Sequence, residues 1–143
     1  MLYFFLIVQS FFITTNPATI WQTNFEEAKR VASEQNKKIL MVFSGSDWCA
    51  PCIKLKKKIL TTEEFQAFEK ENLVVLYLDF PQRKKNRLSK ELTKHNEALA
   101  EQYNRSGRFP NILLMDNTGK VLKNLKYEGQ SPSDFIKEVE VSL

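Results

Sequence analysis

The chain alternates short apolar runs with segments in which apolar residues recur at helical spacing, and this order limits the folds open to it. Mainly apolar runs occupy residues 39–43, 73–80 and 109–116. Runs of this length and composition are typical of strands buried on both faces of a sheet. Helical segments between strands indicate parallel pairing through crossover connections. A turn at 117–119 and a further strand at 121–127 add an antiparallel edge.

The expected helices have recognisable starts. Thr23 and Glu26 have the spacing of a capping box, in which Thr23 caps the free amides and Glu26 reaches back. Either Thr61 or Thr62 can cap a later helix, and Ser131, with a proline in the first turn, marks the start of the last one. The expected helices are 24–35, 52–60, a segment with Phe65 and Phe68, 89–103, and a closing segment with Phe135, Ile136 and Val139.

Together these elements predict an α/β fold, a three-layer sandwich in which helices flank a central mixed sheet of four to five strands. No internal repeat or second domain is visible. In the expected helix at 89–103, which is mainly polar, His95 is expected to be an exposed surface residue. The inner face of that helix is expected to carry Leu92, Ala98, Leu99 and Tyr103.

The first 25 residues carry no charged side chain, and their apolar run covers residues 2–8 and 11–13. An apolar stretch of about a dozen residues is shorter than a membrane helix requires and fits the core of a secretory signal. We therefore expect residues 1–18 to be a signal peptide, residues 19–143 to be the functional domain, and the protein to be exported to the periplasm of the bacterial cell envelope. A buried N-terminal strand or an uncleaved anchor are the alternatives.

Composition excludes several other classes of protein. A chain of 143 residues is one domain in size, and a single His with two Cys cannot form the usual four-ligand zinc site. The net charge of +4 is too small and too dispersed to indicate a nucleic-acid partner. We expect the protein to bind no metal and no organic cofactor, to be a monomer, and not to be stably inserted in a membrane once a signal is removed.

The two cysteines, Cys49 and Cys52, follow a strand and open a helix. Unpaired backbone amides and the helix dipole at that position favour negative charge, so Cys49 is expected to be stabilised as a thiolate. Cys52 lies one helical turn further in, and we expect it to be more buried and to resolve a mixed disulfide on Cys49. Pro51 suits the first turn, because its missing amide hydrogen is not needed there.

Two simpler interpretations of the cysteine pair remain open. A purely structural disulfide would close only a four-residue ring. By lowering the entropy of the unfolded chain it would stabilise the fold by on the order of 2 kcal/mol, against about 3 kcal/mol for a 15-residue loop. Capture of a copper or zinc ion by the pair would need further ligands from His95 or from a partner.

The segment Trp48-Cys49-Ala50-Pro51-Cys52, placed after the strand at 39–43, resembles the active-site segment of the thioredoxin superfamily. The resemblance extends over about residues 19–143 and is strongest to secreted bacterial thioredoxin-like proteins and to the periplasmic C-terminal domain of the thiol:disulfide interchange protein. It implies a cis peptide bond between Phe109 and Pro110. It also implies that the backbone beside Pro110 pairs with an extended segment of the substrate. Phe109 and Trp48 are the further residues expected to contact the substrate, and a role in packing alone is the alternative for Trp48.

The chain departs from the thioredoxin pattern where that family places a buried acid. The strand before the cysteines carries none, and the lysine that pairs with this acid has no counterpart in 73–78. Cys52 therefore needs another route for its proton, and Asp47 is a candidate. Capping of the turn or of the helix start is the alternative role for Asp47. Asn111 replaces the usual threonine after the cis-proline.

The resemblance and the cysteine pattern predict a thiol:disulfide oxidoreductase of the cell envelope that reduces or exchanges protein disulfides. Its partners would be protein disulfide substrates and an upstream thiol electron donor. The alternative is a redox-sensitive binding or chaperone-like module with the same fold and no turnover. The basic run at 83–87 could steer an acidic partner, touch a membrane surface, or be a solvated loop.

Overall fold

The computed structural model describes residues 20–143. The expected signal peptide at 1–18 lies outside the described residues. Within residues 20–143, no helix is both long and apolar enough to cross a membrane.

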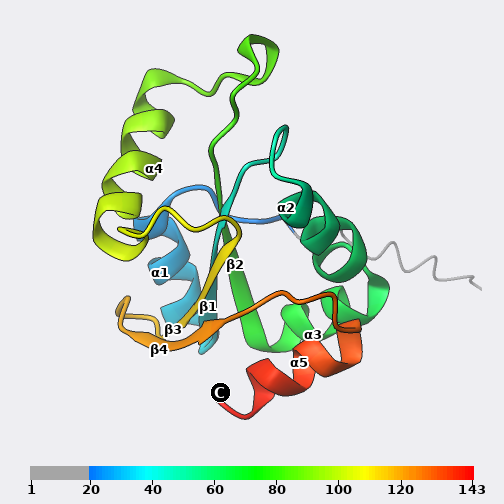
Figure 1. The fold of residues 1–143 in the computed structure, drawn as a ribbon. Helices are drawn as coiled ribbons and strands as arrows, with labels where there is room; N and C mark the ends of the chain where they lie inside the picture. Colours follow the sequence, from blue (N-terminus) through cyan, green and yellow to red (C-terminus); the bar gives the residue numbers. More distant parts are fainter. Residues whose placement is uncertain (1–19) are drawn as a thin grey trace, which may run out of the picture.

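A four-stranded sheet forms the centre of the molecule (Figure 1), with strand order β2-β1-β3-β4. β1 and β2 run parallel, whereas β3 is antiparallel to both β1 and β4. The short bridge of Gln22 to Leu76 adds one further parallel pairing at the outer side of β2. The strands are β1 (Lys38–Ser44), β2 (Leu73–Asp79), β3 (Asn111–Met115) and β4 (Val121–Leu125).

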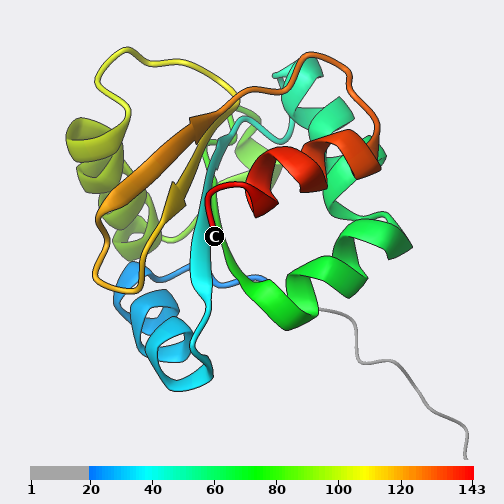
Figure 2. The ribbon, with the colours of Figure 1, turned by 90° about the horizontal axis from the view of Figure 1, so that it is seen from below.

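Helices cover both faces of this sheet and give the predicted three-layer α/β sandwich (Figure 2). Side chains of β1 alternate between two cores: Leu40 and Val42 face one, and Met41 and Phe43 face the other. The first core includes residues of α2 (Ala50–Leu55), the π-helical turn η1 (Lys56–Leu60), α3 (Glu63–Asn72) and α5 (Pro132–Glu140). The second includes residues of α1 (Phe25–Gln35) and α4 (Lys90–Tyr103).

The direction of β3 differs from the parallel pairing that the alternation predicted. After α4, residues 104–110 carry the chain back to the end of β1, where Asn111 pairs with Phe43. The side chain of Asn104 fixes this return by hydrogen bonds to the backbone carbonyl and amide of Arg108. β3 therefore starts beside the end of β1 and runs in the opposite direction.

The cap of α1 is Asn24 rather than the predicted Thr23. Its Oδ1 accepts a hydrogen bond from the amide of Glu27 at 3.0 Å, because the first helical residue is Phe25. Thr62 and Ser131 cap α3 and α5 in the same way, and both were predicted as candidates.

The helix expected over 52–60 begins at Ala50 and changes to π spacing at Lys56. The wider turn allows the consecutive residues Ile59 and Leu60 both to be buried, together with Leu55. In a regular α-helix of about 3.6 residues per turn, Leu60 would be turned by about 140° from Leu55, which lies five residues earlier.

The inner face of α4 also differs from the prediction. Ala98 is exposed, whereas Asn96 and Leu99 are buried. His95 is not an exposed surface residue: its Nε2 accepts a hydrogen bond from the amide of Phe25 at 3.1 Å. Apolar spacing alone could not predict this face, because it includes the polar side chains of His95 and Asn96, which form hydrogen bonds with backbone groups of other elements.

Candidate active site

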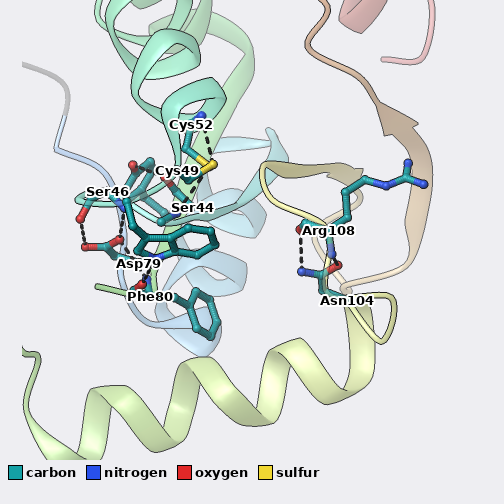
Figure 3. The surroundings of a disulfide bond; sticks show 11 residues. Ser44, Ser46, Cys49, Cys52, Asp79, Phe80, Asn104 and Arg108 are labelled. Atoms are coloured by element: carbon teal, nitrogen blue, oxygen red, sulfur yellow. Dashed lines mark hydrogen bonds between the residues drawn. A yellow bond between two sulfur atoms is a disulfide. The ribbon is translucent and has the colours of Figure 1, made fainter. Parts of the chain in front are cut away.

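The two cysteines lie where β1 ends and α2 begins (Figure 3) and are joined by a disulfide bond. Cys49 is the N-cap residue of α2, with extended backbone, and its Sγ accepts a hydrogen bond from the amide of Cys52 at 3.3 Å. Free amides at a helix start stabilise negative charge, so this position favours a thiolate at Cys49 once the disulfide is reduced.

The two sulfur-bearing residues differ in accessibility. Cys49 is 5% exposed and Cys52 is 1% exposed. The sulfur of Cys52 accepts a hydrogen bond from the amide of Gly45 at 3.5 Å. Cys49 is thus the cysteine nearer to solvent, and Cys52 is held beneath the turn that precedes it.

Gly45 is a residue of this site that the sequence did not single out. Its carbonyl accepts hydrogen bonds from the amides of Cys49 at 2.9 Å and Trp48 at 3.4 Å. A Cβ atom at this position would overlap the indole ring of Trp48. In the sequence, Gly45 lies in a cluster of turn-forming residues at 44–47, and this pattern does not distinguish a close approach of a side chain from an ordinary turn.

Trp48 and Phe109 come together from segments far apart in the chain. Their rings meet edge to face with centroids 5.2 Å apart, and Phe109 meets Phe80 in the same manner at 5.3 Å. The indole Nε1 of Trp48 donates a hydrogen bond to the carbonyl of Phe80 at 2.7 Å, while 41% of the residue stays exposed. This arrangement gives an aromatic surface next to Cys49.

The peptide bond between Phe109 and Pro110 is cis, and Pro110 leads directly into β3 at the end of the sheet that carries the cysteines. Asn111, which stands where thioredoxins carry threonine, donates from Nδ2 to Oδ1 of Asn104 at 3.1 Å. The same amide group lies 3.4 Å from the carbonyl of Tyr103. Asn111 therefore joins β3 to the end of α4.

The carboxylate of Asp47 is bound to the basic loop instead of to the turn or the helix start. It accepts hydrogen bonds from the amides of Gln82 and Arg83, both at 2.9 Å, and from Nδ2 of Asn86 at 3.0 Å. These donors, first the amide of Gln82 and then the side chain of Asn86, lower the pKa of Asp47. A role in proton transfer to Cys52 stays a prediction; the geometry favours a role in holding the loop.

A second aspartate, Asp79, was not identified from the sequence; it binds Ser46 in the turn before the cysteines (Figure 3). Its carboxylate accepts hydrogen bonds from the Ser46 amide at 3.0 Å and the Ser46 hydroxyl at 2.6 Å. Its carbonyl accepts one from Nδ2 of Asn96 at 3.0 Å, which ties α4 to the same end of the sheet. The hydroxyl of Tyr77 in β2 donates a hydrogen bond to Oγ of Ser44 in β1 at 2.7 Å.

No group of three or more His, Cys, Asp or Glu side chains among residues 20–143 is arranged to hold a metal ion. A cysteine pair at a helix start, with one sulfur near solvent and the other beneath it, is suited to exchange between thiols and disulfides. On this fold, that pair makes the chain a thiol:disulfide oxidoreductase.

The family is shown by comparison with known proteins. Residues 20–117 match the family model described as thioredoxin-like, and the chain belongs to that family. Among curated proteins it is similar to the disulfide bond reductase DsbH of Chlamydia pneumoniae, with 33% identity over 123 residues, which cover 86% of this chain and 72% of that protein.

Solved structures agree with this assignment. The structure titled DsbH oxidoreductase has a TM-score of 0.79 and 31% identity, and the match covers 90% of each chain. The oxidised C-terminal domain of DsbD from Neisseria meningitidis has a TM-score of 0.55 and 21% identity, covering 82% of this chain and 90% of that one. The second likeness shows the shared fold. The resemblance to the thioredoxin superfamily expected from the sequence is confirmed.

Proposed function

We propose that this chain reduces protein disulfides, with Cys49 as the attacking thiol and Cys52 as the resolving thiol. The Cys49 thiolate attacks one sulfur of the substrate disulfide, and the other substrate sulfur leaves as a thiolate that takes a proton from water. Cys52 then loses its thiol proton to solvent, its thiolate attacks Sγ of Cys49, and the second substrate sulfur leaves as a thiolate that takes up a proton. Two electrons pass to the substrate, and the disulfide between the two cysteines forms.

The observation that carries this proposal is the unequal placement of the two sulfurs. Cys49 caps α2 and is the more accessible of the two, whereas Cys52 is fully enclosed. An attacking thiol must reach a bulky partner, and a resolving thiol needs to reach only Cys49. The similar protein of Chlamydia pneumoniae is named a disulfide bond reductase, which supports reduction as the direction of electron flow.

Substrate recognition is proposed for Trp48, Phe109 and Pro110. Their side chains lie at the end of the sheet that carries Cys49, and Trp48 is exposed there. An extended segment of the substrate next to its reacting cysteine would contact this aromatic surface. A thiol donor is then needed to return the oxidised pair to the dithiol for the next cycle.

Turnover of insulin disulfides with a thiol donor tests the proposed chemistry. The reduced wild-type domain should accelerate insulin reduction, and Cys49→Ser should lose the activity. Cys52→Ser should lose multiple turnover while still forming a mixed disulfide. Full activity of Cys49→Ser would refute the assigned roles.

The direction of electron flow is tested separately by the redox potential of the pair. A reductant should have a potential near or below about −230 mV, in the range of thioredoxin and glutaredoxins. A potential around −120 mV, typical of strong oxidants, would contradict the reducing role.

We also propose that the protein acts outside the cytoplasm, because of its uncharged, apolar first residues. Residues 1–25 fused to an alkaline phosphatase that lacks its own signal should give an active enzyme in a bacterial host, since that enzyme requires export. A matched fusion with two arginines placed within residues 2–8 should be inactive. Equal activity of both fusions, or none of either, would contradict the proposal.

A further inference from the structure

A groove beside the aromatic surface is not used by the proposed chemistry itself. It has a volume of about 670 Å³ and lies between the end of β2, the following loop and α4. Trp48, which precedes Cys49, and Phe109, whose ring contacts that of Trp48, form one wall, and Phe80 and Leu88 add to its apolar lining. A chain bound at Cys49 could therefore continue over Trp48 into this groove.

The other wall of the groove is basic. Arg87, Lys90 and Lys94 line it, and all three are exposed. None of them forms an ion pair with a carboxylate within the described part of the chain. Two acidic residues, Asp79 and Glu97, also line the groove, so the three cations exceed the carboxylates of the lining by one charge; the Asp79 carboxylate is held by hydrogen bonds from Ser46.

The loop that carries Arg87 and leads to Lys90 and Lys94 of α4 is held in place. Residues 81–94 contain six basic residues and one acidic residue, and in Figure 1 their first part forms the loop between β2 and α4. Asp47, two residues before Cys49, binds this loop through Gln82, Arg83 and Asn86. The loop that leads to the basic wall is thus linked by hydrogen bonds to the segment that carries the attacking cysteine.

We infer that this groove binds an acidic, extended segment of the substrate protein next to its reacting cysteine, with an apolar side chain on Trp48 and Phe109 and acidic side chains facing Lys90 and Lys94. The inference rests on the proposed function and adds the class of substrate. Complementary charge chiefly raises the rate of encounter and selects among partners. The first 25 residues of this chain are uncharged, so they lack the charge that would match the basic wall.

Three model peptides test the inference. Each contains the same intramolecular disulfide and the same apolar residues, flanked on both sides by glutamates, by glutamines or by lysines. Reduced protein is mixed with each peptide in a single turnover, quenched with acid and analysed by mass spectrometry. Each rate constant is divided by that for dithiothreitol, which corrects for intrinsic reactivity. The glutamate peptide should react about tenfold faster than the glutamine peptide at low salt, and added salt should reduce the difference.

A charge-reversal variant locates the effect. Lys90→Glu/Lys94→Glu should abolish or reverse the preference for the glutamate peptide and leave the rate of the glutamine peptide within about twofold of wild type. The matched control is Lys58→Glu/Lys70→Glu, which makes the same change of charge at exposed positions on η1 and α3. These elements pack on the opposite face of the sheet from α4, so the control should keep the preference.

The outcomes separate this inference from the proposed function. Equal reduction of all three peptides would overturn the groove as a specificity site while the reductase function stands. Reduction of none would overturn both. If both Lys90→Glu/Lys94→Glu and the control Lys58→Glu/Lys70→Glu lose the preference for the glutamate peptide, the preference is due to the overall charge of the protein and the inference is overturned. Binding to phosphatidylglycerol vesicles is measured as well. If the three peptides react at equal rates and wild type binds the vesicles whereas Lys90→Glu/Lys94→Glu does not, the groove is a membrane contact and the inference of a substrate site is overturned.

Discussion

At the scale of single residues, the turn before the cysteines depends on Gly45, because the ring of Trp48 lies against its Cα. We predict that Gly45→Ala displaces this ring, breaks its hydrogen bond to the Phe80 carbonyl and lowers insulin reduction several-fold. The indole N–H resonance of Trp48 in an NMR spectrum reports the displacement directly.

Gly129→Ala is the matched control for this substitution. Gly129 has a φ of 87° but nothing within 4 Å of an added Cβ. Its replacement should cost about 1 kcal/mol of stability through backbone strain and leave the Trp48 resonance and the activity unchanged. An unaltered Trp48 resonance in Gly45→Ala would show that the close approach has no consequence.

A buried carboxyl, Glu69, makes stability depend on pH. It is 2% exposed, and in the described residues its hydrogen-bond partner is Nε1 of Trp21 at 3.4 Å. Burial raises the pKa of Glu69 from 4.5 to about 7, against the smaller opposing effects of Trp21 and Lys37. Between these two values the folded state binds more protons than the unfolded state, so the free energy of unfolding falls as pH rises.

We predict that Glu69→Gln removes this dependence and raises the stability of the oxidised protein by about 2 to 3 kcal/mol at pH values above 7. Urea denaturation at about pH 5 and about pH 8 measures the effect. Glu71→Gln, an exposed neighbour on α3, should leave the pH dependence as it is. The same slope in Glu69→Gln and wild type would contradict a raised pKa.

At the scale of elements, Asp47 links the start of α2 to the loop after β2. Asp47→Asn removes the charge that two loop amides bind, so we predict that the amides of Gln82 and Arg83 exchange hydrogen about tenfold faster. Because the pKa of Asp47 is lowered, the protection is present at neutral pH and is lost only as pH falls through the lowered value.

Asp116→Asn provides the comparison for Asp47. Asp116 likewise accepts hydrogen bonds from two backbone amides, those of Thr118 and Lys120, and has a lowered pKa. It should loosen the turn between β3 and β4 and leave the 82–86 loop unchanged. Faster exchange of Gln82 and Arg83 in both variants would indicate a general loss of stability.

Elements with a strong local pattern could be predicted from the sequence, and those set by distant contacts could not. The apolar runs of β1 and β2 and the caps Thr62 and Ser131 are properties of adjacent residues. The direction of β3 depends on how Asn104 fixes the return after α4. The buried face of α4 includes Asn96, whose burial is compensated by the carbonyl of Asp79 from another element.

At the scale of the whole molecule, the same distinction applies to the site. The position of Cys49 and Cys52 at a helix start was predictable, because a strand followed by a helix is read from consecutive residues. The engagement of Asp47 by the loop 35 residues away was not, since it needs the folded sheet to bring the two segments together. The groove between α4 and Trp48 likewise arises only from the packed structure.

The central claim is that Cys49 attacks and Cys52 resolves, and the most direct measurement is the identity of the sulfur that binds substrate. Cys52→Ser and Cys49→Ser are each reduced, mixed with a disulfide peptide and analysed by tandem mass spectrometry. The account predicts a stable mixed disulfide on Cys49 in Cys52→Ser and little adduct on the enclosed Cys52 in Cys49→Ser. A stable adduct on Cys52, formed as fast as that on Cys49, would contradict it.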